Sequence, residues 1–291
     1  MPGSRRRGDN AALDPMTSPT DTLANLNGSI VLAGAGKMGG AMLSGWLAQG
    51  VTPAKVAVIE PMPSDDIKAL AAKGVRLNVT PAEIGDVAAL VVAVKPQMFR
   101  EAGPQLRPLV KPSTLVMSIM AGTPIATLSE ICGGTVVRTM PNTPAAIGRG
   151  ITVAVAGSDI TAQQRAIVDA LLRATGAVEW VDDEQLMDAV TAVSGSGPAY
   201  VFLLAEELAR AGIAAGLPPA LATTLARHTV SGAGELLHRS DLDSAVLRQN
   251  VTSPGGTTAA ALDVLMGKDG FQPLLERAVA AATRRSKELA K

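Results

Sequence analysis

The sequence predicts an α/β fold in two parts, a doubly wound sheet with helices on both faces followed by an all-helical domain. Two observations lead to this prediction. Short β-branched apolar runs alternate with helical segments up to about residue 183. Beyond that point Ala, Leu and Gly dominate segments of helical spacing that prolines separate. We therefore expect a disordered leader over residues 1–26 and domains over residues 27–183 and 184–291.

Composition indicates a globular chain that is not expected to bind nucleic acid or an anionic membrane. Of the 291 residues, 47% are hydrophobic and 18% charged, which is enough apolar surface to form a core. The 26 basic residues balance the 26 acidic ones, so neither nucleic acid nor an anionic membrane is an expected partner. The longest apolar runs, 87–94 and 199–205, are well short of the roughly 20 residues that cross a membrane. We expect a cytoplasmic protein.

The first element is an apolar strand beginning at Ser29, followed by a glycine turn and a helix that ends at Gly50. A second apolar run, 55–60, predicts a parallel strand and closes a βαβ unit. Helix 67–73 follows. Further strands are predicted at 88–94, 114–120, 135–138, 151–156 and 177–181.

The turn of the βαβ unit has the spacing GxGxxG, formed by Gly34, Gly36 and Gly39 around Lys37 and Met38. Such glycines permit the turn, let a pyrophosphate approach the backbone, and bring the helix close to the strand. A tight turn without a ligand is the alternative interpretation. The strand before the turn and the helix after it favour a dinucleotide site.

Glu60 ends the second strand, 21 residues after Gly39. A carboxylate there accepts hydrogen bonds from ribose hydroxyls and repels a 2′-phosphate. Because no arginine follows within seven residues, the segment favours NADH over NADPH; an ordinary solvated charge is the alternative.

Two more segments end strands at the same edge of the predicted sheet. Val94, Lys95 and Pro96 follow one strand, and Asn142 lies in the MPNTP run of residues 140–144. The switch-point rule for open α/β sheets places them near a bound dinucleotide, with Asn142 toward the nicotinamide. Taken alone, Lys95 is better explained as a surface charge.

The helical part begins with Ser196 as an expected N-cap and Pro198 in the first turn, and a long helix ends at Gly216. Much of this helix is apolar all round. Because about 108 residues cannot cover it on every side, we expect it to pack against a second subunit.

The segment 251–258, VTSPGGTT, directly precedes another predicted helix. Ser253 is an expected cap, Gly255 and Gly256 leave backbone amides bare, and Thr257 and Thr258 supply hydroxyls. This combination describes a small-anion site at a helix N-terminus, although an ordinary N-cap explains it equally well. The Ser-Gly-Ser-Gly run of residues 194–197 either faces the same pocket or caps its helix.

The sequence offers no strong general acid or base and no clear metal ligands. Cys132 is the single cysteine, and His228 and His238 lie on helical segments where a structural role is the simpler interpretation. A reduction that needs little general acid or base catalysis is consistent with this set of side chains.

These motifs together resemble one family. GAGKMGG, VAVKP, MPNTP, AVSGSGPAYVF and NVTSPGGTTAAALDVL are similar to segments of pyrroline-5-carboxylate reductase, and the resemblance covers residues 29 to about 290. It implies a Rossmann-like domain, a helical domain that interlocks with a partner subunit, and pentamers of dimers in many members. It also implies NADPH or NADH as hydride donor and L-1-pyrroline-5-carboxylate as the substrate reduced to L-proline.

The resemblance further implies roles for the glycine loop of the helical domain. Thr258 matches the residue that hydrogen-bonds the imine nitrogen, while Ser253, Gly255, Gly256 and Thr257 lie where the substrate carboxylate is held. Glu60 departs from the family pattern, since many relatives that prefer NADPH have a neutral or basic residue there.

Two other functions compete with this one. β-Hydroxyacid dehydrogenases share the architecture, but they use a catalytic lysine, and neither Lys268 nor Lys287 lies in a recognisable catalytic motif. A nucleotide-sensing protein without turnover is the alternative from another class, with residues 251–258 as a simple helix cap.

Overall fold

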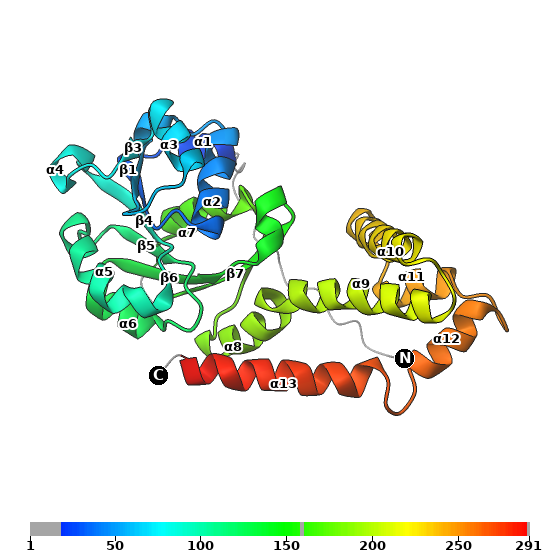
Figure 1. Cartoon of the computed structure of the whole chain (residues 1–291). Helices are drawn as coiled ribbons and strands as arrows, with labels where there is room; N and C mark the ends of the chain where they lie inside the picture. The colour runs from blue at the N-terminus through cyan, green and yellow to red at the C-terminus, as the bar shows by residue number, and fades with distance from the viewer. Residues whose placement is uncertain (1–18, 158–159, 290–291) are drawn as a thin grey trace, which may run out of the picture.

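The computed structural model describes residues 19–157 and 160–289, and it shows a helix-covered sheet joined to an extended set of helices (Figure 1). The eight strands lie in the order β3-β2-β1-β4-β5-β6-β7-β8. Every neighbouring pair is parallel except β6 and β7. The strands are β1 (Ser29–Ala33), β2 (Val56–Ile59), β3 (Arg76–Leu77), β4 (Val87–Val92), β5 (Leu115–Ser118), β6 (Thr135–Met140), β7 (Gly150–Ala156) and β8 (Gly176–Trp180).

Helices cover both faces of the sheet because the strands are apolar on both sides. In β1, Ile30 and Leu32 face one cluster with side chains of α2 and α7, while Val31 and Ala33 face another with α5 and α6. The predicted doubly wound α/β fold is confirmed. The helices of this part are α1 (Pro19–Ala24), α2 (Lys37–Ala48), α3 (Asp65–Ala72), α4 (Pro81–Ile84), α5 (Phe99–Leu106), α6 (Ile125–Cys132) and α7 (Ala162–Arg173).

The expected leader is wrong for its last residues. Residues 19–24 form α1, and Leu23 and Leu26 are buried in the core cluster on the α2 and α7 side. The Lys55 ammonium donates hydrogen bonds to the carbonyls of Ala24 and Leu26, at 2.7 and 3.1 Å. Two buried leucines therefore fix this segment to the sheet domain; residues 1–18 lie outside the described part of the chain.

The helices that follow the sheet leave most of their apolar surface exposed. Among the described residues, α9 buries no side chain and α10 buries only Ala222 and Ala226. Phe202 is 68% exposed. These helices are α8 (Met187–Val190), α9 (Gly197–Ala214), α10 (Pro219–Arg239), α11 (Ser244–Asn250), α12 (Thr257–Leu265) and α13 (Phe271–Leu289), and α13 returns to α8 (Figure 1).

The Ser-Gly-Ser-Gly run is not the helix start that the sequence predicts. Residues Thr191–Gly195 form a π-helix, η6, which continues α8 into α9, and Ser196 has helical angles and no capping hydrogen bond. The Tyr200 hydroxyl donates to the carbonyl of Ala192 at 3.0 Å. This tyrosine hydroxyl is therefore one of the groups that satisfy the π-helix carbonyls.

Candidate active site

The glycine loop joins β1 to α2 at the point where strand order reverses. Gly34 has φ +93°, and a Cβ there would lie 2.6 Å from the carbonyl oxygen of Ala93. A Cβ on Gly39 would collide with the carbonyl oxygen of Gly34, whereas one on Gly36 would meet nothing within 4 Å. Gly34 and Gly39 are thus required by packing, and Gly36 faces open space.

The start of α2 suits an anion. Gly36 is the N-cap residue, no side chain caps the helix, and no acidic residue lies in the first turn, which Lys37 and Met38 begin. The unpaired N–H groups and the helix dipole favour negative charge at this position. A dinucleotide pyrophosphate fits here, in the open space beside Gly36 that a Cβ on this residue would occupy.

Glu60, immediately after β2, directs its carboxylate to the glycine loop. Oε2 accepts a hydrogen bond from Ala35 N at 2.8 Å, and Oε1 accepts one from Met62 N at 3.0 Å. Each carboxylate oxygen has a further lone pair for a ribose hydroxyl. The acid that the sequence singled out therefore lies beside the loop that it was expected to serve.

The other predicted dinucleotide residues lie along the same edge. Val94, Lys95 and Pro96 follow β4, with Pro96 opening a 3-10 turn, η2 (Pro96–Met98). Asn142 follows β6, where its Oδ1 accepts from Ile151 N at 3.0 Å and its Nδ2 donates to Ser194 Oγ at 3.4 Å. The Asn142 amide thus joins the sheet edge to η6, and its contact with nicotinamide stays a prediction.

A cavity of about 590 Å³ lies between the sheet edge and the helices. Its sheet side is formed by the loops after β4 and β5, and its helical side by η6 and α13. The residues lining it include Pro96, Ala121, Gly122, Thr123, Thr191, Ser196 and Ser286. Sequence reasoning missed the loop 121–124 and Ser286, although the Ala-Gly pair directly after an apolar strand is a signal that could have found the loop.

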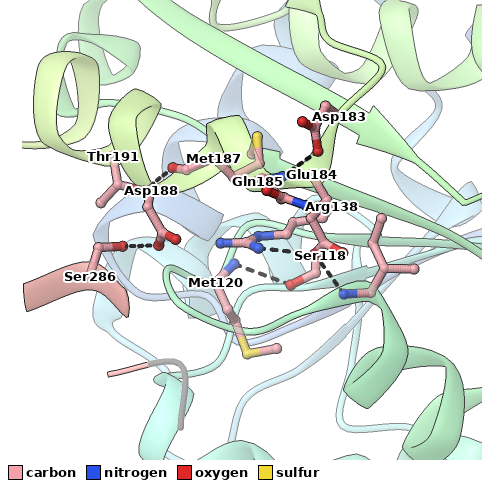
Figure 2. Close-up of polar contacts among 11 residues, drawn as sticks. Ser118, Met120, Arg138, Asp183, Glu184, Gln185, Met187, Asp188, Thr191 and Ser286 are labelled. Carbon is pink, nitrogen blue, oxygen red and sulfur yellow. Dashed lines mark hydrogen bonds and ion pairs between the residues drawn. The ribbon is translucent and has the colours of Figure 1, made fainter. Parts of the chain in front are cut away.

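Polar contacts join the sheet domain to the segment that leads into the helices, and join two of the helices to each other (Figure 2). The Arg138 guanidinium pairs with Glu184 Oε1 at 2.9 Å, and the same oxygen accepts from Ile125 N at the start of α6. On the helical side, the Ser286 hydroxyl of α13 lies 2.6 Å from Asp188 Oδ1. Because Arg138 is only 6% exposed, its ion pair is well shielded from water.

The loop of residues 251–256 lies elsewhere in the chain. Gly255 has φ +67°, and Gly256 is the N-cap of α12, which Thr257 and Thr258 begin. Ser253 was expected to cap this helix, but no side chain does; its carbonyl accepts from Gly256 N at 3.0 Å because the loop turns before the helix begins. In Figure 1, α12 lies at the end of the helical part away from the sheet, so one chain does not bring this loop to the glycine loop.

Comparisons with known proteins identify the family. A model described as pyrroline-5-carboxylate reductase dimerisation matches residues 184–289, and one described as NADP oxidoreductase coenzyme F420-dependent matches residues 29–122. The pyrroline-5-carboxylate reductase of Pseudomonas aeruginosa is 40% identical over 264 residues, 90% of this chain and 96% of that relative. The chain belongs to the pyrroline-5-carboxylate reductase family.

Solved structures of pyrroline-5-carboxylate reductases have the same fold. The enzyme of Coxiella burnetii superposes with a TM-score of 0.84 at 32% identity, covering 91% of this chain and 99% of that one. That of Plasmodium falciparum, which has NADP bound, gives 0.76 at 29% identity, with the same coverage. The fold, family and NAD(P)H cofactor class expected from the sequence are therefore confirmed.

The match to the dimerisation model explains the exposed apolar helices. Large hydrophobic side chains such as Phe202 and Leu203 are exposed on these helices, as is typical of a surface that packs in a homo-oligomer. In the part of the chain that the structure describes, no helix is long and apolar enough to span a bilayer, and no group of acidic, His or Cys side chains is arranged to hold a metal ion.

Proposed function

We propose that this chain reduces L-1-pyrroline-5-carboxylate to L-proline by hydride transfer from NADH or NADPH. Membership of the pyrroline-5-carboxylate reductase family carries this conclusion, and the open space at Gly36 supports it. Purified protein mixed with pyrroline-5-carboxylate should oxidise at least one of NADH and NADPH, which is measured as a fall in the absorbance of the reduced nicotinamide. No loss of absorbance with either nucleotide would instead favour a sensing protein without turnover.

The dinucleotide is held by the residues at the sheet edge. Gly34, Gly36, Lys37, Met38 and Gly39 receive the pyrophosphate through backbone amides and close packing. At the nicotinamide end, the contacts come from Val94, Lys95, Pro96 and Asn142. When bound, the reduced nicotinamide supplies the hydride; the chain orients it and excludes water.

Glu60 makes NADH the preferred donor. Its carboxylate is fixed 2.8 Å from Ala35 N and presents acceptors to ribose hydroxyls, whereas a 2′-phosphate would be repelled. The ratio of kcat/KM for NADH to that for NADPH tests this assignment, and a strong preference for NADPH would overturn it.

The substrate is held at the start of α12. The Gly255 amide and the hydroxyls of Ser253 and Thr257 bind the carboxylate, and the Thr258 hydroxyl hydrogen-bonds the imine nitrogen. Gly256 was expected to bind the carboxylate as well, but its N–H already donates to the Ser253 carbonyl, so it shapes the turn instead. A protonated imine is already electrophilic, so orientation and one hydrogen bond carry much of the catalysis. Gly255 and Gly256 are free of side chains at this turn, which supports close approach of an anion.

Substitution of Thr258 tests the assigned role directly. Thr258→Ala should lower kcat by about tenfold or more, roughly 1.4 kcal/mol of transition-state stabilisation, and leave NADH affinity nearly unchanged. Steady-state kinetics and a fluorescence titration with NADH measure the two quantities. Unaltered turnover would remove Thr258 from the mechanism.

Because α12 and the glycine loop lie apart in one chain, we infer that each active site is shared between two subunits. The bare apolar face of α9 supports an intertwined dimer, in which the partner supplies the loop of residues 251–256. The proposal includes a decamer of five such dimers and a division into domains 27–183 and 184–291. It also places the protein in the cytoplasm, without nucleic-acid or membrane partners.

Mixed dimers distinguish a shared site from a site within one chain. A Gly36→Val subunit paired with a Thr258→Ala subunit has one site with both lesions and one with neither if sites are shared. Such mixed dimers should recover about half of wild-type activity, since one of two sites is intact. If each chain forms its own site, every site has one lesion and the mixed dimers stay as inactive as either variant.

A further inference from the structure

Asn78 has an unusual backbone conformation beside the proposed ribose site. Among the described residues that are not glycine, it alone has a positive φ, +52°. It follows the two-residue edge strand β3, and its own N–H donates to the carbonyl of Val58 at 2.8 Å. Left-handed conformations cost a residue with a Cβ, and asparagine adopts them more readily than most residues.

The Asn78 side chain holds the backbone of Glu60 by two hydrogen bonds. Glu60 N donates to Asn78 Oδ1 at 2.8 Å, and Asn78 Nδ2 donates to the Glu60 carbonyl at 2.9 Å. The pairing of β2 with β3 ends at Val58 and Leu77, so this amide takes the place of the next ladder bonds. Glu60, whose carboxylate is proposed to bind the ribose, is thereby fixed just beyond the end of its strand.

The Glu60 carboxylate is fixed at its other end by the glycine loop. Its two oxygens accept from Ala35 N and Met62 N, at 2.8 and 3.0 Å. A carboxylate on an exposed strand end would otherwise sample several rotamers. With the backbone held by Asn78 and the carboxylate by two amides, one orientation remains.

We propose that Asn78 is a positioning residue that sets the preference for NADH by holding Glu60 against the glycine loop. The inference rests on the proposed role of Glu60 in cofactor choice. A fixed carboxylate meets the ribose hydroxyls without further ordering and stands where a 2′-phosphate would come. A loosened one turns away from that phosphate, so both the gain with NADH and the penalty with NADPH shrink.

Asn78→Gly is the decisive variant, because glycine accepts φ +52° without strain and removes only the amide. We expect the ratio of kcat/KM for NADH to that for NADPH to fall roughly fivefold, the size of one hydrogen bond. The change should come from KM, with kcat nearly constant. Asn27→Gly, at an exposed asparagine just before the amino end of β1, is the matched control and should leave the ratio unchanged.

The same substitution in a Glu60→Ala background separates positioning from a structural role. If Asn78 acts through Glu60, Asn78→Gly changes the ratio there by less than about twofold. A loss of efficiency that is equal for both nucleotides and persists without Glu60 would overturn the inference. Thermal unfolding of each variant monitors folding, and the ratio is measured below the unfolding transition of the least stable variant, so that reduced stability of Asn78→Gly does not obscure the test.

Failure of the inference is distinguishable from failure of the proposed cofactor choice. If Glu60→Ala lowers the ratio and Asn78→Gly does not, Glu60 selects the nucleotide without help from Asn78. If Glu60→Ala leaves the ratio at the wild-type value, the role of Glu60 fails and the inference fails with it, while pyrroline-5-carboxylate reduction itself is untouched.

Discussion

Gly36 and Gly34 illustrate how neighbouring glycines serve different purposes. Gly36→Val places a side chain in open space, so it should block dinucleotide binding by about 100-fold or more while changing stability little. Gly34→Ala should instead destabilise the fold by about 2 kcal/mol or more, because φ +93° and the Ala93 carbonyl both exclude a Cβ. Fluorescence titration and chemical denaturation separate the effects; normal NADH binding by Gly36→Val would contradict the assignment.

Cys132 gives the stability a dependence on alkaline pH. Burial raises the pKa of its thiol to about 11, whereas an unfolded thiol titrates near 8.5. The unfolded state therefore loses its proton first, so the contribution of this thiol to stability is complete below about pH 8.5 and declines as pH rises toward 11. Denaturation midpoints across this range should fall less steeply for Cys132→Ala, and equal slopes would refute the assignment.

At this scale the sequence pointed to candidate site positions but not to their hydrogen-bond partners. Glu60 was found because the dinucleotide pattern places an acid about 20 residues beyond the glycines. Asn78 was not, because its contact with Glu60 depends on two strands becoming neighbours. Asn142 was singled out by its place after a strand, but its bond to Ser194 depends on η6, which the sequence did not predict, and its bond to Ile151 depends on where β7 begins.

Among the elements, the π-helix η6 receives one of its hydrogen bonds from a side chain, the Tyr200 hydroxyl. Tyr200→Phe removes the donor to the Ala192 carbonyl and should lower the free energy of unfolding by about 1–2 kcal/mol, the cost of an unsatisfied buried acceptor. Denaturation at a fixed protein concentration measures the change. A difference below about 0.3 kcal/mol would show that water or another donor replaces the hydroxyl.

Strands with continuous apolar runs were predictable, and short or unusual elements were not. The sheet strands β1, β2 and β4 through β8 match the predicted runs, because burial on both faces requires such residues. The strand β3 has two residues, too few to show a period. Ser-Gly-Ser-Gly-Pro is typical of a break, yet the segment is helical as η6, and Gly195 leaves room there for the Met140 side chain.

For the whole molecule, the apolar surface of α9 is the feature that predicts assembly. Phe202→Glu should give monomers in analytical ultracentrifugation, because burying an unpaired charge in the interface is costly. Turnover should be abolished, while NADH affinity stays within about threefold of wild type. Gln105→Glu on α5 adds the same charge to the sheet domain and should stay oligomeric. Turnover by a monomeric Phe202→Glu chain would contradict the shared site.

The separation of α12 from the sheet also bears on how the protein behaves when it is scarce. If turnover needs two chains, the catalytic unit is the pair, and the rate becomes proportional to the square of chain concentration once dilution splits most pairs. Dinucleotide binding, confined to one chain, would continue unchanged over that range. At low chain concentration the cell would then contain monomers that bind dinucleotide but are inactive, and synthesis of more chain would activate them by raising the concentration of dimers.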